Sequence, residues 1–305
     1  MTAKNLLMAV GIALMIAACG GGGSGSESRP VESRTGYLNI ALTDAPVDDV
    51  TEVNVQFTGV VLKPASGNEI EIVFDNPKDI DLLTLTGGIT AELLPDTPVP
   101  AGAYNWIRLA VNAEFDNIFD SYAMLPTGQV ELRVPSGGQN GLKLVSGFTV
   151  SADQSINIVI DWDLRKALSN PIGQPGLHLR PALRIADMAA SGTLSGIISG
   201  TWVMQKSCDN DLAAQTGNAV YIYNGTVDTP GDIGDAQNEP LTTATVRQDE
   251  SGSYAYEVHF LPVGNYTAAF TCQANSDDSE SDDDIEFLEP QSFVIEVGAT
   301  TIVNF

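Results

Sequence analysis

Short runs of alternating apolar and polar residues dominate the start of the chain. The alternation begins at Tyr37–Leu42 and recurs at Val53–Phe57, and the apolar run Val60–Leu62 completes that second segment. A period of two places apolar side chains on one face of an extended strand. The pattern therefore predicts β-strands, of which Thr43–Pro46 ends the first.

Similar runs continue to about residue 186. They predict further strands at residues 70–74, 106–111, 129–134, 142–144, 148–150, 156–161 and 183–186. Residues 79–85 fit either a strand or a helical turn, and residues 98–104 fit a turn. One short helix is predicted at Leu164–Ser169, because Pro171 bars its continuation.

A break of small residues at Ala189–Gly192 separates these runs from a second set. The second set predicts strands at residues 193–198, 219–223, 242–247, 254–260, 266–271, 293–297 and 301–305. Strands this short, with so little helix, are typical of sandwiches. We therefore expect an all-β chain with two β-sandwich modules in tandem, at residues 36–190 and 191–305.

The N-terminal segment has the pattern of an export signal. Lys4 precedes the apolar run Leu6–Ala18, which is too short to span a bilayer. Ile16–Cys19 resembles the bacterial lipobox, in which the cysteine receives a lipid and becomes the mature N-terminus. We expect residues 1–18 to be a lipoprotein signal peptide and Cys19 to be the lipidation site. The alternative is an ordinary secretory signal with an incidental cysteine.

Residues 19–35 are rich in glycine and serine, which is typical of a flexible tether. Gly20 follows the cysteine. In this respect the chain resembles Gram-negative lipoproteins that have no aspartate at that position and are sorted by default to the outer membrane. The predicted location is therefore the cell envelope, with a lipid anchor in the membrane.

Charge narrows the choice of partners. The chain has 39 Asp and Glu against 14 Lys and Arg, a formal net charge of -25. Such a surface repels nucleic acid and anionic lipid headgroups. With two histidines and three cysteines, zinc-finger, haem and iron–sulfur frameworks are also poor candidates.

Cys208 and Cys272 lie in the second module of a chain predicted to be exported. Paired cysteines are normally bridged in oxidising compartments, so we expect a disulfide between them. A redox pair or a thiolate metal site is the alternative, but neither a C-x-x-C motif nor a nearby histidine accompanies them.

Residues 277–286 hold seven carboxylates in ten positions. Such a dense run predicts a solvated loop, unless a cation neutralises it. The alternative is a calcium site, because Ca²⁺ prefers oxygen ligands, although the spacing lacks the glycine and terminal glutamate of an EF-hand. The candidate ligands are Asp277, Asp278, Asp282, Asp283 and Asp284.

Asp161 and Asp163 share one face at the end of a predicted strand, on either side of Trp162. Such a pair can hold a cation or act as acid and base, but capping of the following helix is the favoured interpretation. Asp44 is assigned an Asx turn in the same way. His178, Arg180 and Arg184 form either a small anion site or, as favoured, arginines paired with carboxylates.

Known catalytic signatures are absent from the sequence. It contains no G-x-S-x-G, no H-E-x-x-H and no phosphate-binding glycine loop. We therefore predict no catalytic residue.

The first module resembles a known family. Its residues 36–46, 57–60, 160–163 and 179–185 look like the domain-of-unknown-function family numbered 4382. The resemblance covers about Gly36 to Met188 and implies an exported, often lipid-anchored protein without an established activity.

The second module resembles the carboxypeptidase regulatory-like, prealbumin-like sandwiches, which are grouped with carbohydrate-binding-like folds. Asp249–Tyr254 and Leu261–Tyr266 carry the likeness, and they are turn and core residues rather than a ligand signature. The stretches Thr226–Glu239 and Asn275–Glu289 are long insertions relative to that pattern.

These observations favour a non-enzymatic, membrane-anchored envelope lipoprotein that acts as a binding or adhesion module. Its expected partners are the membrane, through the lipid, and a polysaccharide or envelope protein. One alternative is carbohydrate binding by the second module, assisted by calcium, with Trp202, Tyr221 or Tyr223 stacking on sugars. Packing in the core is nevertheless the favoured interpretation of Tyr221 and Tyr223. The other alternative is a carboxylate-based glycoside hydrolase, which needs two acids facing across a cleft.

Overall fold

The computed structural model describes residues 34–45, 47–48, 50–135, 141–171, 173, 175–288 and 290–305. Cys19 and the predicted signal and tether at residues 1–33 lie outside these residues. Arg34–Phe305 forms one compact unit. Within the described residues, no helix is long and apolar enough to cross a membrane.

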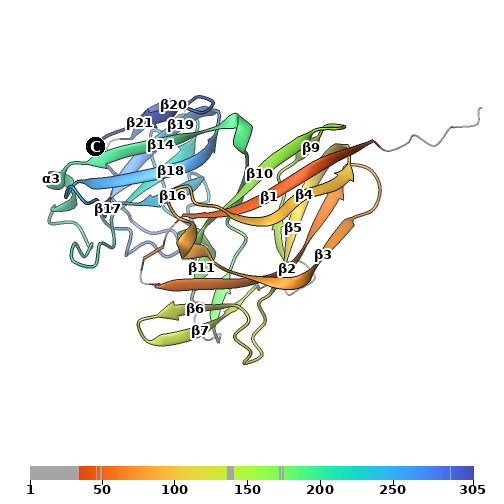
Figure 1. Ribbon diagram of the computed structural model, residues 1–305. Helices are drawn as coiled ribbons and strands as arrows, with labels where there is room; N and C mark the ends of the chain where they lie inside the picture. The colour runs from red at the N-terminus through yellow and green to blue at the C-terminus, as the bar shows by residue number, and fades with distance from the viewer. Residues whose placement is uncertain are drawn as a thin grey trace, which may run out of the picture. The chain divides into compact units, whose positions relative to one another are not determined.

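The N-terminal half of this unit is a sandwich of two sheets, and we call residues 35–187 the N-terminal sandwich. Its first sheet has the order β13-β10-β1-β4, with β1 and β10 parallel (Figure 1). Alternate residues of β1, namely Leu38, Ile40 and Leu42, are buried, as the period of two predicts. The strands are β13 (Leu183–Asp187), β10 (Ser155–Asp163), β1 (Thr35–Ala45) and β4 (Ala91–Pro100).

The second sheet packs against the first around β2 and its neighbours. Its order is β11-β12-β7-β6-β2-β5-β8, with β3 added to β2 and β9 added to β5. The strands are β2 (Glu52–Pro64), β3 (Ile70–Asp81), β5 (Gly102–Asn112), β6 (Tyr122–Leu125), β7 (Gly128–Arg133), β8 (Leu142–Leu144), β9 (Phe148–Val150), β11 (Leu168–Ser169) and β12 (Leu177–Leu179).

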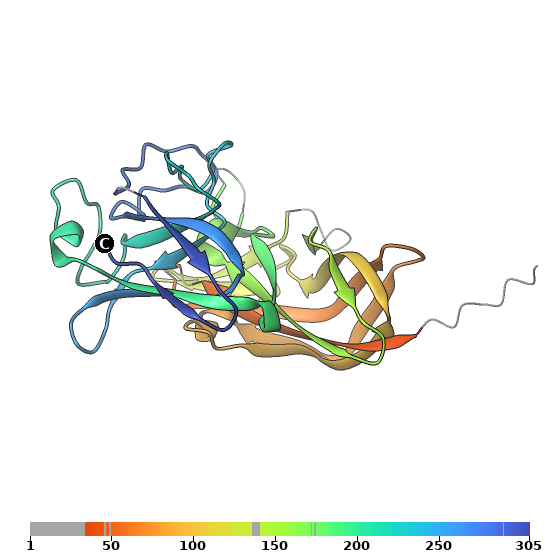
Figure 2. The ribbon, with the colours of Figure 1, turned by 90° about the horizontal axis from the view of Figure 1, so that it is seen from above.

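The remaining strands form a second sandwich, which we call the C-terminal sandwich (residues 191–302; Figure 2, green to blue). One sheet has the order β17-β18-β14-β21 and the other β16-β15-β19-β20. The strands are β14 (Ser191–Ile198), β15 (Ala219–Asn224), β16 (Thr242–Thr245), β17 (Arg247–Gln248), β18 (Tyr254–Pro262), β19 (Gly264–Thr271), β20 (Gln291–Ile295) and β21 (Thr300–Ile302).

The helical segments within the described ranges are short. They are η1 (Leu82–Leu85), α2 (Leu164–Ala167), η2 (Met188–Ala190) and α3 (Gly200–Val203). The predicted all-β class with two sandwiches is confirmed. Separate hydrophobic cores fill the two sandwiches, but residue 190 as a boundary between independent domains stays a prediction.

Several details differ from the sequence-based expectation. Residues 98–104 were expected to be a turn, but β4 runs to Pro100 and β5 begins at Gly102. Prolines are tolerated in β4 because, among the strands that the structure describes, it pairs with β1 alone and so lies at the edge of the sheet. The predicted helix ends at Ala167, since Leu168 and Ser169 enter β11. β1 continues through Thr43–Ala45, and the side chain of Asp44 lies outside the described set.

Candidate functional site

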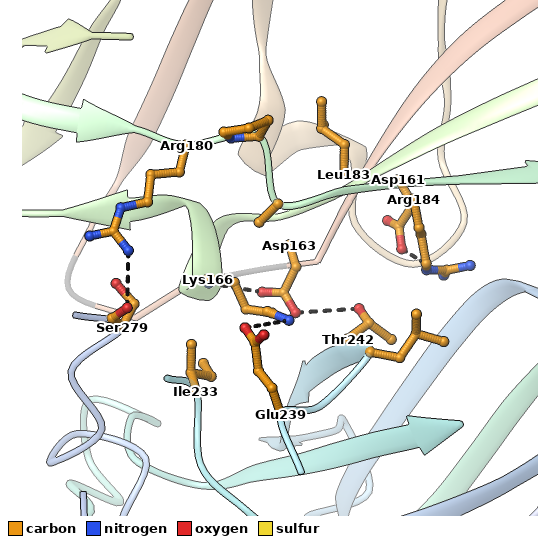
Figure 3. Close-up of a pocket in the computed structure, with 13 residues that line it drawn as sticks. Asp161, Asp163, Lys166, Arg180, Leu183, Arg184, Ile233, Glu239, Thr242 and Ser279 are labelled. Carbon is orange, nitrogen blue, oxygen red and sulfur yellow. Dashed lines mark hydrogen bonds and ion pairs between the residues drawn. The ribbon is translucent and has the colours of Figure 1, made fainter. Parts of the chain in front are cut away.

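A cavity of about 360 Å³ lies where the end of β10 and helix α2 meet loops of the C-terminal sandwich (Figure 3). It includes both carboxylates of the Asp161–Trp162–Asp163 motif, so it is the place to test their predicted roles. Its lining residues are Asp161, Asp163, Lys166, Arg180, Pro181, Ala182, Leu183, Arg184, Ile233, Glu239, Leu241, Thr242 and Ser279.

Asp161 is paired with Arg184. The carboxylate oxygen Oδ2 lies 2.6 Å from Arg184 Nη2, and both side chains are almost fully buried. Arg184 also donates to the main-chain oxygens of His259 and Phe260, at 2.8 and 2.6 Å. Burial raises the pKa of Asp161, and the attraction of Arg184 opposes this rise. Asp161 therefore orients an arginine that fastens β18 to the N-terminal sandwich.

Asp163 has a second, separate set of donors. It caps α2 by accepting from Lys166 N at 3.2 Å, as predicted for this residue. From β16 it accepts the main-chain N–H of Thr243 at 2.6 Å and the hydroxyl groups of Thr242 and Thr243 at 3.3 and 3.0 Å. Its carboxylate joins the helix start to the C-terminal sandwich.

The basic residues of the cavity are also engaged. Lys166 Nζ lies 2.9 Å from Glu239 Oε1 and donates to Pro240 O at 2.6 Å. Arg180 pairs with Glu280 and donates to Ser279 O at 3.0 Å. The three cations and three carboxylates among the lining residues balance. This arrangement suits cohesion between the sandwiches better than general acid–base catalysis, which needs a carboxyl group within reach of substrate.

One buried ion pair of this region was missed in the sequence. Arg165 Nη2 lies 2.6 Å from Asp48 Oδ2, and Arg165 also donates to Ala274 O at 3.1 Å. Gly217 N donates to the same oxygen of Asp48 at 3.3 Å. Asp48 raises the pKa of Arg165 against the opposing effect of burial. Sequence offers no signal for the pair, because its members lie 117 positions apart.

His178 is buried in β12, and burial together with Arg133 lowers its pKa. Arg180 and Arg184 are engaged with the carboxylates described above, in agreement with the favoured interpretation. Tyr221 and Tyr223 are fully buried, so the suggested stacking of these two rings on sugars is wrong. Trp202 is 38% exposed.

The predicted disulfide between Cys208 and Cys272 is confirmed. It links the loop after α3 to the end of β19.

The acidic loop is only partly assembled into a cluster. Carboxylate oxygens of Asp277 and Asp283 lie within 4.8 Å of each other and of Asp232. Asp232, from the loop between β15 and β16, was not among the predicted ligands, although its loop was marked as an insertion. The other predicted ligands, Asp278, Asp282 and Asp284, do not belong to this group.

Residues 35–181 match the family described as Domain of unknown function (DUF4382). The predicted resemblance of the N-terminal region is thereby confirmed. The match includes Asp161, Asp163 and Arg165 and ends just before Arg184. No curated protein is similar enough to count as a match.

Solved structures show only a distant likeness. The Bacillus anthracis TIE protein is 13% identical with a TM-score of 0.21, and the alignment covers 89% of this chain and 34% of that one. The chain thus spans about a third of the length of that protein. The minor pilin GBS52 of Streptococcus agalactiae is 10% identical with a TM-score of 0.20, and the alignment covers 88% of this chain and 94% of that one. A candidate cell adhesion protein from Parabacteroides distasonis is 12% identical with a TM-score of 0.22, and the alignment covers 87% of this chain and 85% of that one.

Proposed function

We propose that this protein is a non-enzymatic lipoprotein of the bacterial envelope, which presents a two-sandwich body as a binding or adhesion module. The observation that carries the proposal is the use of Asp161 and Asp163. These carboxylates are the most suggestive catalytic pair in the sequence, yet both are occupied: Asp161 pairs with Arg184, which in turn bonds to β18, and Asp163 accepts from Thr243 of the C-terminal sandwich. Their role is cohesion of the body.

The expected anchor supports the same interpretation. Lipidation at Cys19, followed by the glycine- and serine-rich tether, would hold the folded body close to a membrane, in the outer membrane of a Gram-negative cell. The net charge of -25 directs the choice of partner away from nucleic acid and toward polysaccharide or envelope protein.

The two alternatives are less well supported. Carbohydrate binding through aromatic residues of one strand cannot use Tyr221 and Tyr223, because both rings are buried in the core. A glycoside hydrolase needs one carboxylic acid and one carboxylate directed at a glycosidic bond, whereas Asp161 faces Arg184 and Asp163 faces β16.

The anchor and the adhesive role can be tested together in the natural host. A strain lacking the gene is complemented with the wild-type protein or with Cys19→Ala, and retention of cells on an abiotic surface and on a layer of a second cell type is measured. We expect the deletion to reduce retention and only the wild-type protein to restore it. Full restoration by Cys19→Ala, or no loss on deletion, would overturn the proposal.

The non-enzymatic part has its own test. The purified protein is incubated with a panel of glycans, and released reducing sugar is measured for the wild type, Asp161→Asn and Asp163→Asn. We expect no release from any sample. Release by the wild type that both variants lack would establish a hydrolase instead.

A further inference from the structure

Three aspartates from two separate loops converge beside the β15–β19 sheet. Asp232 lies between β15 and β16, whereas Asp277 and Asp283 lie between β19 and β20, and their oxygens are within 4.8 Å of one another. We propose that Asp232, Asp277 and Asp283 bind a calcium ion that joins the two long insertions of the C-terminal sandwich. This proposal is independent of the adhesive role.

The first argument is electrostatic. Asp232 is only 2% exposed, and burial of a carboxylate is unfavourable unless hydrogen bonds or a cation compensate for it. In the described part of the chain, none of the three aspartates forms an ion pair with a lysine, arginine or histidine. Arg165, whose charge acts on Asp277, is bound to Asp48. No lysine, arginine or histidine of the described residues is therefore paired with the cluster, and a metal ion would supply the compensating charge.

The second argument is an unused ligand atom. Asp277 Oδ2 accepts hydrogen bonds from the Tyr221 hydroxyl and from Ile233 N. Its other oxygen, Oδ1, is buried from water and has no hydrogen-bond partner among the described residues. An unpaired buried acceptor is unfavourable by about 1–3 kcal/mol. A cation between the carboxylates would supply the missing interaction.

The spacing favours calcium among the common hard cations. Ca²⁺ takes oxygen ligands at about 2.3–2.6 Å, so two oxygens on one ion lie no more than about 5 Å apart. The observed limit of 4.8 Å meets this requirement. Mg²⁺ demands a stricter octahedral arrangement and usually retains several waters, which an enclosed group such as Asp277 Oδ1 accommodates poorly.

The surrounding chain already holds the two loops together. Asp283 N donates to Asp232, and Gly234 lies so close to Ser281 that a Cβ there would be 2.2 Å from its main-chain oxygen. The same acidic loop reaches the N-terminal sandwich through Ser279 and Glu280, which contact Arg180. An ion at the cluster would therefore stabilise the loop that contacts Arg180.

The site can be tested by luminescence and calorimetry on the full-length protein in detergent, stripped of metal with a chelator. Tb³⁺ replaces Ca²⁺ as the probe, because the Tyr221 ring, bonded to Asp277, can sensitise its emission. We expect tyrosine-excited Tb³⁺ emission that Ca²⁺ competes away, and calcium binding in the range of about 10⁻⁵ to 10⁻³ M. Calcium should also raise the melting temperature.

Variants distinguish the cluster from the rest of the acidic loop. Asp232→Asn and Asp277→Asn keep the shape of the side chain and should weaken calcium binding roughly tenfold or more. Without calcium they should melt at or above the wild-type temperature, because they reduce repulsion between carboxylates. Asp282→Asn and Asp284→Asn are the matched controls and should change calcium affinity less than about twofold.

Two results would overturn the proposal. One is an unchanged melting temperature and no heat of binding up to about 10 mM Ca²⁺, well above the affinity of extracellular sites. The other is an equal loss of binding in the cluster variants and in the controls, which would indicate diffuse attraction of cations to the loop.

Discussion

Asp161 and Asp163 stand two positions apart on one strand and share a face, but they hold different partners. Asp161 forms an ion pair with Arg184, whereas Asp163 accepts hydrogen bonds from the start of α2 and from two threonines of β16. Trp162 between them is buried against Phe57 and donates from Nε1 to Arg180 O at 3.3 Å. The buried ring fixes the strand end that positions both carboxylates.

Removing the Asp163 carboxylate tests this structural role. Asp163→Ala deletes a helix cap and the bonds to Thr242 and Thr243, so we expect the free energy of unfolding to fall by about 3 kcal/mol. Urea denaturation followed by circular dichroism measures it. Asp187→Ala is the control, because Asp187 caps η2 through a single bond to Ala189 N, and it should lower the free energy by about 1 kcal/mol. Equal effects of the two variants would contradict the role assigned to Asp163.

Buried tyrosines predict sensitivity to alkali. Burial raises the pKa of Tyr104, Tyr256 and Tyr266 above the ordinary value of 10. Above pH 10 the unfolded chain therefore loses protons that the folded chain retains. Each such group then lowers the free energy of unfolding by up to about 1.4 kcal/mol per pH unit. Stability is thus greater below pH 10 and declines as the pH rises above it.

Tyr256→Phe isolates one of these groups. Tyr256 is 2% exposed and donates its hydroxyl to Val303 O at 2.8 Å. At pH 7 the variant should lose about 1 kcal/mol with the hydrogen bond. Above pH 10 the free energy of unfolding of the variant should decline less steeply with pH than that of the wild type. The difference in slope should correspond to about one proton released on unfolding. Parallel pH profiles from urea denaturation would refute the assignment.

Residue-level features were predictable where a short segment or the residue composition determined them. The cap at Asp163 follows from a carboxylate placed before a helix start, and the disulfide follows from the presence of two cysteines in one module of a chain that is expected to be exported. Asp232 and Arg165 were not predictable, because their partners lie far along the chain, as with Asp48 and Arg165 at a separation of 117. Such contacts depend on which loops the sheets bring together.

At the scale of elements, alternation located most strands but not β4. Pro95, Pro98 and Pro100 indicate a turn by local propensity. Tertiary position overrides this propensity, because β4 is an edge strand of the described sheet, where a missing N–H group need not break a ladder hydrogen bond. The end of α2 at Ala167 has a similar cause, since pairing of β11 with β12 extends the backbone from Leu168.

The disulfide between the loop after α3 and the end of β19 is expected to stabilise the folded state. Cys208 and Cys272 are 64 positions apart, and the bridge restricts the unfolded state. The double variant Cys208→Ser/Cys272→Ser should lose about 4 kcal/mol of stability in chemical denaturation. Cys19→Ser removes a cysteine but leaves the bridge intact, so its stability should match the wild type. A double variant as stable as the wild type would show that the bridge contributes nothing.

At the scale of the whole body, charge is distributed unequally between the sandwiches. Residues 191–305 contain 18 carboxylate side chains but only Lys206 and Arg247 as lysine or arginine, whereas residues 36–190 contain nine basic residues. Four of those nine contact the C-terminal sandwich or its loops, namely Arg165, Lys166, Arg180 and Arg184. The sequence suggested that arginines pair with carboxylates, but not that Arg165, Arg180 and Arg184 would also bond to the C-terminal sandwich.

This distribution predicts that the two sandwiches unfold together. The ion pair of Arg165 and Asp48 is about 95% buried and bonds to Ala274 and Gly217 of the C-terminal sandwich. Removal of one member of a buried ion pair is unfavourable by about 3–5 kcal/mol. Differential scanning calorimetry of the wild type should show one transition. Arg165→Met leaves Asp48 buried without its cation, so the contact should weaken and the transition should separate into two.

Arg247→Met is the matched control, because Arg247 is exposed on β17. It removes the same charge from the molecule and should leave a single transition at nearly the wild-type temperature. Two transitions in the wild type would mean that the contact adds little cohesion, and the sandwiches would then behave as independent modules. A single transition that persists in Arg165→Met would place the cohesion in the remaining contacts, of which Asp163 and Arg184 are the buried ones. Combining Arg165→Met with Asp163→Ala should then produce the separation.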